Sequence, residues 1–251
     1  MKKAAKQNPR VPIICADPSA VVGANIFNLN TWSGKSKGIV QSCWTEYSVL
    51  DHCVGQIIGI CGASERLCQK HIETIRQQWH AQKFDLQKVI IYSQQPDLHL
   101  RIEAFFSGVK TLLDLLVQLL SSEKVVVVSV DGFHRAQNIY GGKVLNALSN
   151  NASKNRKEIA AKMEALIIEH KSLWLDQAIF ARDQLIHPEI GMHQLMFQLQ
   201  FNKQGDNLNC VKVRPPVIDS KVIDQYAKLV LEHIQIFASN FIGLLRDGCS
   251  V

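Results

Sequence analysis

The stretch from residue 98 to residue 121 constrains the fold more than any other part of the chain. Its apolar residues recur at the 3.6-residue spacing of an α-helix and cover more than half of the circumference. They are Ile102, Phe105, Phe106, Val109, Leu112, Leu113, Leu116, Leu119 and Leu120. A helix this apolar needs cover on most of its surface, so it lies at the centre of a bundle or at a subunit interface. Leu115 and Val117 stand off the main stripe and favour the interface.

Other parts of the chain repeat the helical spacing. They are residues 38–61, 64–82, 157–187 and 220–246. In the helix expected at residues 157–187, the residues expected to face inward are Ile159, Met163, Leu166, Ile167, Leu173, Trp174, Ala178, Ala181 and Leu185. Pro188 ends this helix, because its ring disfavours helical geometry at the residue before it. A shorter helix is expected near residues 143–150.

A change of period to two after Pro188 predicts β-structure. The apolar residues that alternate here are Leu195, Phe197, Leu199 and Phe201. Gly205 and Asp206 favour a turn, and a second strand-like run follows at residues 208–214. We therefore expect a β-hairpin within residues 192–214.

Two other short runs favour extended structure. Residues 88–92 form a β-like run that fits a strand, the end of a helix or an extended connector. The four valines at 125–128 favour a strand by propensity, and we interpret them as an edge strand or a connector into a short helix. Gly141-Gly142-Lys143 follows, but its distance from Gly132 and the lack of Ser or Thr after the lysine do not fit a phosphate-binding P-loop.

The order of these segments predicts the fold class. Strands do not alternate with helices, which argues against a parallel α/β sheet. We expect a mainly all-α fold, a bundle of about five helices with a β-hairpin after the long helix. Residues 1–35 are expected to form an irregular tail with a short strand near 11–15. Residues 36–95 are expected to form N-terminal helices, and residues 98–246 the bundle with its hairpin.

Composition narrows the class of protein. Of the 251 residues, 47% are hydrophobic and 20% are charged, which is the balance of a globular chain. The net charge of +6 is compatible with an anionic partner. Met1-Lys2-Lys3 is not followed by the apolar core of a signal peptide, and no membrane helix of about 20 apolar residues is predicted. We therefore expect a cytoplasmic protein with no membrane partner.

The seven cysteines do not predict a metal centre. No two of them form a Cys-x-x-Cys pair, and Cys68-Gln69-Lys70-His71 lacks a second pair of ligands. We interpret Cys43, Cys53, Cys61 and Cys68 as small buried thiols in a reducing compartment. No metal and no cofactor are predicted.

The end of the long helix carries the side chains best suited to chemistry. Arg182, Asp183 and His187 lie within its last two turns. Arginine offers a planar fork of donors to a phosphate, and histidine can move a proton near neutral pH. A basic residue in a last helical turn also complements the helix dipole, so its presence alone does not demonstrate a site. Phe133-His134-Arg135 and His193 are weaker candidates for the same cleft.

Arg182-Asp183-Gln184-Leu185-Ile186-His187 resembles the motif of HEPN domains, in which an arginine, a polar residue, three further residues and a histidine end a long helix. The resemblance covers roughly residues 98–246. It implies a compact helical bundle that works as a dimer. Many members of the family are metal-independent ribonucleases, and others are nucleotide-binding or interaction modules. The valine run and the hairpin are not part of the family's minimal bundle.

The resemblance implies a metal-independent endoribonuclease or RNA-binding protein, in the setting of a toxin or defence component. The 2′-hydroxyl of RNA would be the nucleophile, with His187 as base or acid. Arg182 would hold the phosphate, and Asp183 would orient Arg182 or His187. One chain supplies one such histidine, so two proton-transfer roles predict a homodimer. RNA, a second copy of the chain and an antitoxin or other protein are the expected partners.

Two other interpretations remain open at this stage. The first is a non-catalytic helical module for dimerisation or partner binding, which allows His187 to be buried. The second is a nucleotide-binding α/β protein built on the strand at 124–130, which requires a parallel sheet. The environment of Arg182 and His187 separates the first interpretation from an RNA-cleaving protein.

Overall fold

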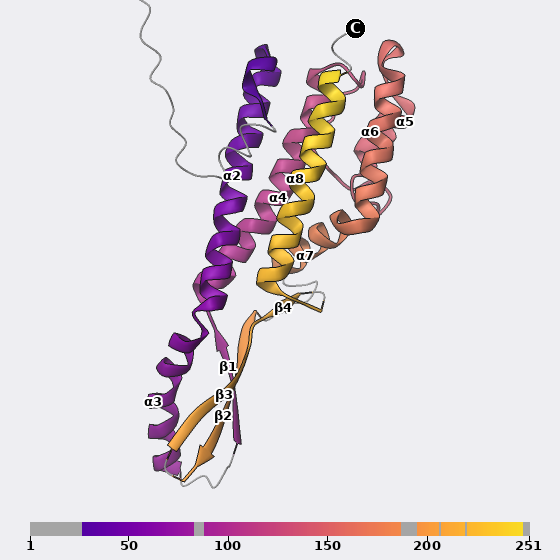
Figure 1. The fold of residues 1–251 in the computed structure, drawn as a ribbon. Helices are drawn as coiled ribbons and strands as arrows, with labels where there is room; N and C mark the ends of the chain where they lie inside the picture. The colour runs from indigo at the N-terminus through magenta and orange to yellow at the C-terminus, as the bar shows by residue number, and fades with distance from the viewer. Residues whose placement is uncertain (1–26, 83–87, 187–194, 206, 219, 248–251) are drawn as a thin grey trace, which may run out of the picture.

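The computed structural model describes residues 27–82, 88–186, 195–205, 207–218 and 220–247. Helices hold 70% of these residues, which confirms a mainly helical chain. One part of the molecule, the helical body, contains α2 (Gly34–Gly62), α4 (Pro96–Ser122), α5 (Gly142–Asn150), α6 (Lys157–His170), α7 (Asp176–Ile186) and α8 (Ile223–Asp247). The other part, the lobe, contains α3 (Ser64–Gln82), β1 (Lys88–Gln94), β2 (Met196–Gln204) and β3 (Asn207–Arg214). The lobe extends from one end of the body, so the molecule is elongated (Figure 1).

The most apolar helix, α4, lies at the centre of the helical body. It packs against α2, α7 and α8. Leu112, Leu113 and Leu116 have no exposed surface, and Val117 is only 2% exposed. Leu115 is partly buried against the same core. The side chains whose positions favoured a subunit interface are therefore covered within this chain.

By length and composition alone, α4 could also cross a membrane, although the sequence had indicated no such span. Its most apolar 18-residue window is 56% buried inside the structure. A core helix has the same properties, because it too must be apolar around most of its circumference.

A glycine allows α2 and α4 to approach closely. A Cβ atom added to Gly108 would lie 2.6 Å from Glu46 Oε1 and 2.8 Å from Leu50 Cδ2. Leu50 is completely buried, so it has little room to move. Any side chain at position 108 would therefore push α2 away from the central helix.

The helix predicted for residues 157–187 is interrupted in its middle. A π-helical turn, Lys171–Leu175, joins α6 to α7. Trp174, Ala178, Ala181 and Leu185 are buried as expected, so the inward face continues past this turn. Leu173 is 55% exposed, whereas Leu175 is buried. The prediction that Leu173 faces inward was wrong, because it lies at the edge of the buried stripe that contains Trp174.

The valine run does not form a strand. The backbone N–H of Val125 donates to the carbonyl of Leu120 at the end of α4 (2.8 Å), and Val126 makes an isolated bridge to Ala152. Val125 and Val126 are buried, but Val127 is 72% exposed. The expectation of a connector is met and that of an edge strand is not, because no neighbouring strand pairs with this run among the described residues.

The lobe contains a three-stranded antiparallel sheet in the order β1-β2-β3. Residues Lys88–Gln94 pair with β2 along their whole length, so the run at 88–92 is a strand. Phe197, Leu199 and Phe201 are buried on one face of the sheet. Hydrogen bonds from α3 to β1 and β3 place this face against α3. A register shift between Gln200 and Phe201 marks a β-bulge in the β2–β3 pair.

The segments expected to be N-terminal additions belong to the same packing unit. Phe27 and Trp32 are buried on either side of the short 3₁₀ helix Leu29–Thr31. The strand expected near 11–15 lies outside the described residues. At the boundary predicted near residues 95–98, β1 leads directly into α4. β1 precedes this boundary in the sequence, yet it pairs with β2, which lies after it. Short elements complete the fold: η2 (Lys154–Arg156), β4 (Val217–Ile218) and β5 (Lys221–Val222).

Candidate functional site

Asp183 on α7 is the centre of the best-formed polar cluster near the predicted motif. Its carboxylate accepts hydrogen bonds from Arg182 Nη1 (3.0 Å), Arg135 Nη2 (3.2 Å) and the hydroxyl of Tyr140 (3.3 Å). The Asp183 side chain is 15% exposed, so these contacts are partly shielded from solvent. We call these four residues the Asp183 cluster. One carboxylate therefore orients two guanidinium groups and a phenol.

The loop between α4 and α5 delivers Arg135 and Tyr140 to this cluster. Phe133 anchors the loop, because its ring is 1% exposed and its backbone N–H donates to Asp114 (2.6 Å). Gly141 then adopts a positive φ of 68°, and a Cβ atom there would lie 2.3 Å from the Phe133 ring. Glycine is required at this position by both its conformation and the close approach.

A tight turn within the loop places Arg135 beside Tyr140. Ala136 and Ile139 exchange backbone hydrogen bonds of 3.1 and 2.9 Å around the turn. The Arg135 guanidinium lies over the Tyr140 ring, 3.9 Å from its centroid, and also donates to the Tyr140 hydroxyl. Burial raises the pKa of Tyr140, so its hydroxyl is a proton donor at neutral pH. Half of the Arg135 side chain (49%) is exposed, so this cation faces both the cluster and solvent.

A third cation, Lys171, holds the same loop through a hydrogen bond to its backbone. Lys171, in the π-helical turn, donates to the backbone carbonyl of Tyr140 (2.7 Å) and to Asp176 Oδ1 (2.6 Å). Its side chain is 13% exposed. The π-turn therefore contains a lysine that hydrogen-bonds to the loop that carries Arg135.

The predicted residues are placed only in part. Arg182 and Asp183 are adjacent on α7 and joined by a hydrogen bond. His187 and His193 lie outside the described residues. Arg135, a weaker candidate in the sequence, contacts Asp183, whereas His134 instead lies near Asp131 (3.5 Å).

Periodicity and motifs in the sequence did not identify two residues of the site. Tyr140 and Lys171 carry no motif, and their roles depend on a loop conformation and a π-turn that periodicity does not reveal. Arg182 Nε is buried and has no hydrogen-bond partner among the described residues. A buried donor of this kind is costly unless something satisfies it.

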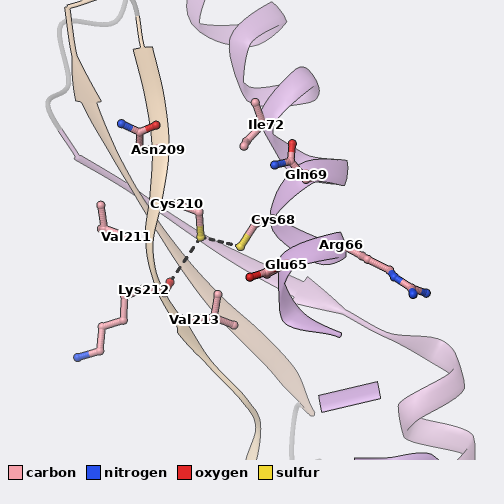
Figure 2. A pocket seen from close by; sticks show the side chains of 10 residues that line it. All are labelled: Glu65, Arg66, Cys68, Gln69, Ile72, Asn209, Cys210, Val211, Lys212 and Val213. Carbon is pink, nitrogen blue, oxygen red and sulfur yellow. Dashed lines mark hydrogen bonds between the residues drawn. The ribbon is translucent and has the colours of Figure 1, made fainter. Parts of the chain in front are cut away.

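A hollow lies elsewhere in the described structure, between α3 and β3 of the lobe (Figure 2). It has a volume of about 740 Å³ and is lined by residues that include Cys68, Cys210 and Glu65. The Cys68 and Cys210 Sγ atoms are 2.7 Å apart. Burial is the main cause that raises the pKa of Cys68 to about 12, so this thiol stays protonated at neutral pH. The described residues contain no group of three or more His, Cys, Asp or Glu suited to a metal ion.

The buried histidine of the body has a structural role. His170 is 5% exposed, and its Nδ1 accepts a hydrogen bond from Trp174 Nε1 (2.8 Å). Burial lowers the pKa of His170, with a smaller contribution from His233. The ring is therefore held neutral inside the helical body, away from solvent.

The resemblance to HEPN domains rests on the motif and its place at the end of α7. A scan of protein-family models, a search of curated proteins and a search of solved structures each found no match to this chain. The geometry of the Asp183 cluster is therefore the main guide to function.

Proposed function

We propose that this chain is a HEPN-like RNA-binding protein and metal-independent endoribonuclease. In this proposal the Asp183 cluster binds a phosphate of RNA, and His187 transfers a proton at the same place. The observation that carries the proposal is the pair of arginines, Arg135 and Arg182, held by a single carboxylate.

The geometry supports phosphate binding for an electrostatic reason. Asp183 compensates one of the two positive charges, so the pair keeps a net positive charge beside a partly exposed surface. A guanidinium has five N–H donors, and the described hydrogen bonds of Arg135 all leave from Nη2. Donors therefore remain on the half-exposed Arg135 for the oxygens of a phosphate.

The proposed reaction uses the RNA's own 2′-hydroxyl as the nucleophile. A base removes its proton, the oxygen attacks the adjacent phosphorus, and an acid protonates the departing 5′-oxygen. Arg182 and Arg135 stabilise the charge that develops on the phosphate. His187 supplies one proton-transfer group, and the second comes from His187 of another copy in a homodimer.

The dimer proposal has a different structural basis from the one first expected. Most of the apolar stripe of α4 is buried within the chain, so this proposal does not place the interface there. Leu173, in the π-helical turn, is 55% exposed, and Phe180, two residues before the motif, is 47% exposed. Exposed apolar side chains on the stretch that leads to the Asp183 cluster would allow a second copy to bring its own cluster close.

Cleavage of a labelled single-stranded RNA in the presence of EDTA tests the proposal. Arg182→Ala and His187→Ala should each lower the rate by about 100-fold or more, because a group acting in the transition state is lost. Arg182→Lys should restore little, since lysine lacks the planar fork. His52→Ala, at an exposed position on α2, is the matched control and should cleave normally. Unchanged cleavage in His187→Ala, or a rate abolished by EDTA, would contradict the mechanism.

A second candidate function is a non-catalytic module that dimerises or binds a partner protein. It is favoured by the stacking of Arg135 on Tyr140, since this contact can simply fasten the loop to α7. In that case Arg182→Ala would lower thermal stability, and no RNA cleavage would be seen in the parent protein.

A further inference from the structure

The outward face of the lobe sheet combines cations, amides and a tyrosine. The pairing register places three residues side by side in each of two rows across the sheet. One row is Tyr92, Gln198 and Arg214, and the other is Ile90, Gln200 and Lys212. Lys88 lies at the end of β1 on the same face, because side chains alternate along a strand.

This face is positively charged. Lys88, Lys212 and Arg214 are exposed, and they surround a shallow hollow of about 140 Å³ with Ile90, Gln198 and Gln200. The outward positions of the described strands carry no carboxylate, and no described salt bridge joins these three cations to an acidic residue. Three cations that have no acidic partner among the described residues, within one small surface, attract an anion with several charges.

An aromatic ring and amides accompany the cations. Tyr92 is 64% exposed, which is unusual for a tyrosine in the middle of a paired strand. Gln198 donates to the Tyr92 hydroxyl (3.4 Å) and accepts from Arg214 Nη1 (3.3 Å). The row is thus held together by its own side chains, while the ring remains available to a ligand.

We propose that this face of the lobe binds single-stranded nucleic acid. The cations neutralise backbone phosphates, Tyr92 stacks on one base, and Gln200 offers an amide to a base edge. The inference deepens the proposed function, and it rests on that function only for the choice of RNA over DNA. The lobe would hold the strand while the Asp183 cluster acts on a phosphate elsewhere along it.

A single strand fits these features better than a duplex. In a duplex the base faces are covered by neighbouring bases, so an exposed tyrosine on a nearly flat sheet has nothing to stack on. In a single strand every base has an accessible face. The seven residues of β1 span about 23 Å at roughly 3.3 Å per residue, enough for a short segment of a few nucleotides.

Fluorescence anisotropy with a labelled 12-nucleotide RNA at several salt concentrations tests the proposal in the full chain. The triple variant Lys88→Gln/Lys212→Gln/Arg214→Gln should bind at least tenfold more weakly. Its slope of log affinity against log salt should fall by about 2, since each lost phosphate contact contributes about 0.7. The control Lys35→Gln/Lys37→Gln/Lys154→Gln removes the same charge from exposed positions on the body and should bind nearly as the parent does.

Tyr92 variants separate stacking from general attraction of anions. Tyr92→Ala should weaken binding about tenfold, and Tyr92→Phe should bind as the parent does, because it keeps the ring. Equal binding by the triple variant and its control would overturn the proposal, as would equal affinity for duplex RNA. Competition by polyglutamate as strong as that by RNA would instead assign the face to acidic proteins. A DNA strand of the same sequence shows whether the sugar matters.

The two proposals can fail separately. Sheet variants that lose binding while Arg182→Ala retains cleavage would support the sheet face and contradict the Asp183 cluster. Variants of the cluster that lose cleavage while sheet variants keep full affinity would do the reverse.

Discussion

The helical body and the lobe are built around different centres, a helix in the body and a three-stranded sheet in the lobe. In the body, α4 buries leucine and phenylalanine side chains on nearly every side. In the lobe, Leu67 and Ile75 are buried apolar residues of α3, and two contacts of α3 with the sheet are polar: Cys68 with Cys210, and His71 with Ser93. Apolar contacts are insensitive to pH and redox conditions, whereas thiols and imidazoles are not. The contacts between α3 and the sheet are therefore a part of the lobe that pH or redox conditions can alter.

The largest effect is expected from the centre of the body. Leu113→Ala should lower the free energy of unfolding by about 2–5 kcal/mol, because it removes buried apolar surface and leaves a cavity. Leu113 has no exposed surface. Urea denaturation followed by circular dichroism measures the change. Leu100→Ala on the same helix is the control, since Leu100 is 59% exposed and should change stability by about 0.5 kcal/mol at most.

The same substitution in the lobe should have a more local effect. Leu199 is also fully buried, but it packs in a small sheet covered by one helix. Leu199→Ala should therefore speed hydrogen exchange in β1, β2 and β3 and leave α4 and α8 protected. Exchange measured by mass spectrometry on peptides from both parts checks this. If α4 exchanges faster by the same factor, the two parts unfold as one unit and the comparison fails.

The contrast between Gly108 and Gly55 tests the packing inside the body. Gly108→Ala should destabilise the protein by about 1–3 kcal/mol, because its new methyl group overlaps Glu46 and Leu50. Gly55→Ala, within α2, meets no atom within 4 Å and should stabilise the protein by up to about 1 kcal/mol. Thermal melts of the two variants give opposite shifts. Shifts of the same sign would show that helix propensity, and not the approach of α2 to α4, governs both positions.

The sequence predicts those helices, strands and buried residues that depend on local periodicity. The period of 3.6 located α4 and its buried leucines, and the alternation after Pro188 located the residues of β2 that are buried. It failed at Leu173, which lies at the edge of the buried stripe, and it did not reveal the π-turn at Lys171–Leu175. It also could not decide whether residues 88–92 are a strand, since that depends on β2, more than 100 residues away.

The candidate site shows the same limit. Arg182 and Asp183 were identified from the order of residues in one helix. Arg135 and Tyr140 join them through a loop whose path depends on Phe133 and Gly141, so their contact with Asp183 is a property of tertiary structure. Sequence patterns report neighbours along the chain, and a cluster assembled from two segments needs the fold.

The smallest effect is expected from pH, and in the lobe it comes from His71. Burial lowers the pKa of His71, with a smaller effect from Lys70, so the folded lobe binds a proton more weakly than the unfolded chain does. The stability of the lobe should therefore be constant above pH of about 7 and decrease as pH falls through the unfolded value of about 6.5. Exchange protection of β1–β3, corrected for intrinsic rates, should be lower at pH 5.5 than at pH 7.5.

A variant assigns this pH effect to one histidine. His71→Gln keeps a polar group that can reach Ser93, whose Oγ lies 2.8 Å from His71 Nε2, but it does not titrate. It should remove the pH dependence of the lobe and leave that of the body, where burial likewise lowers the pKa of His170. A lobe that gains protection on acidification, in the parent protein, would show that protonated His71 is the favoured form. The contact between α3 and the sheet would then stabilise a charge, and the contrast with the apolar contacts of α4 would be larger than burial alone implies.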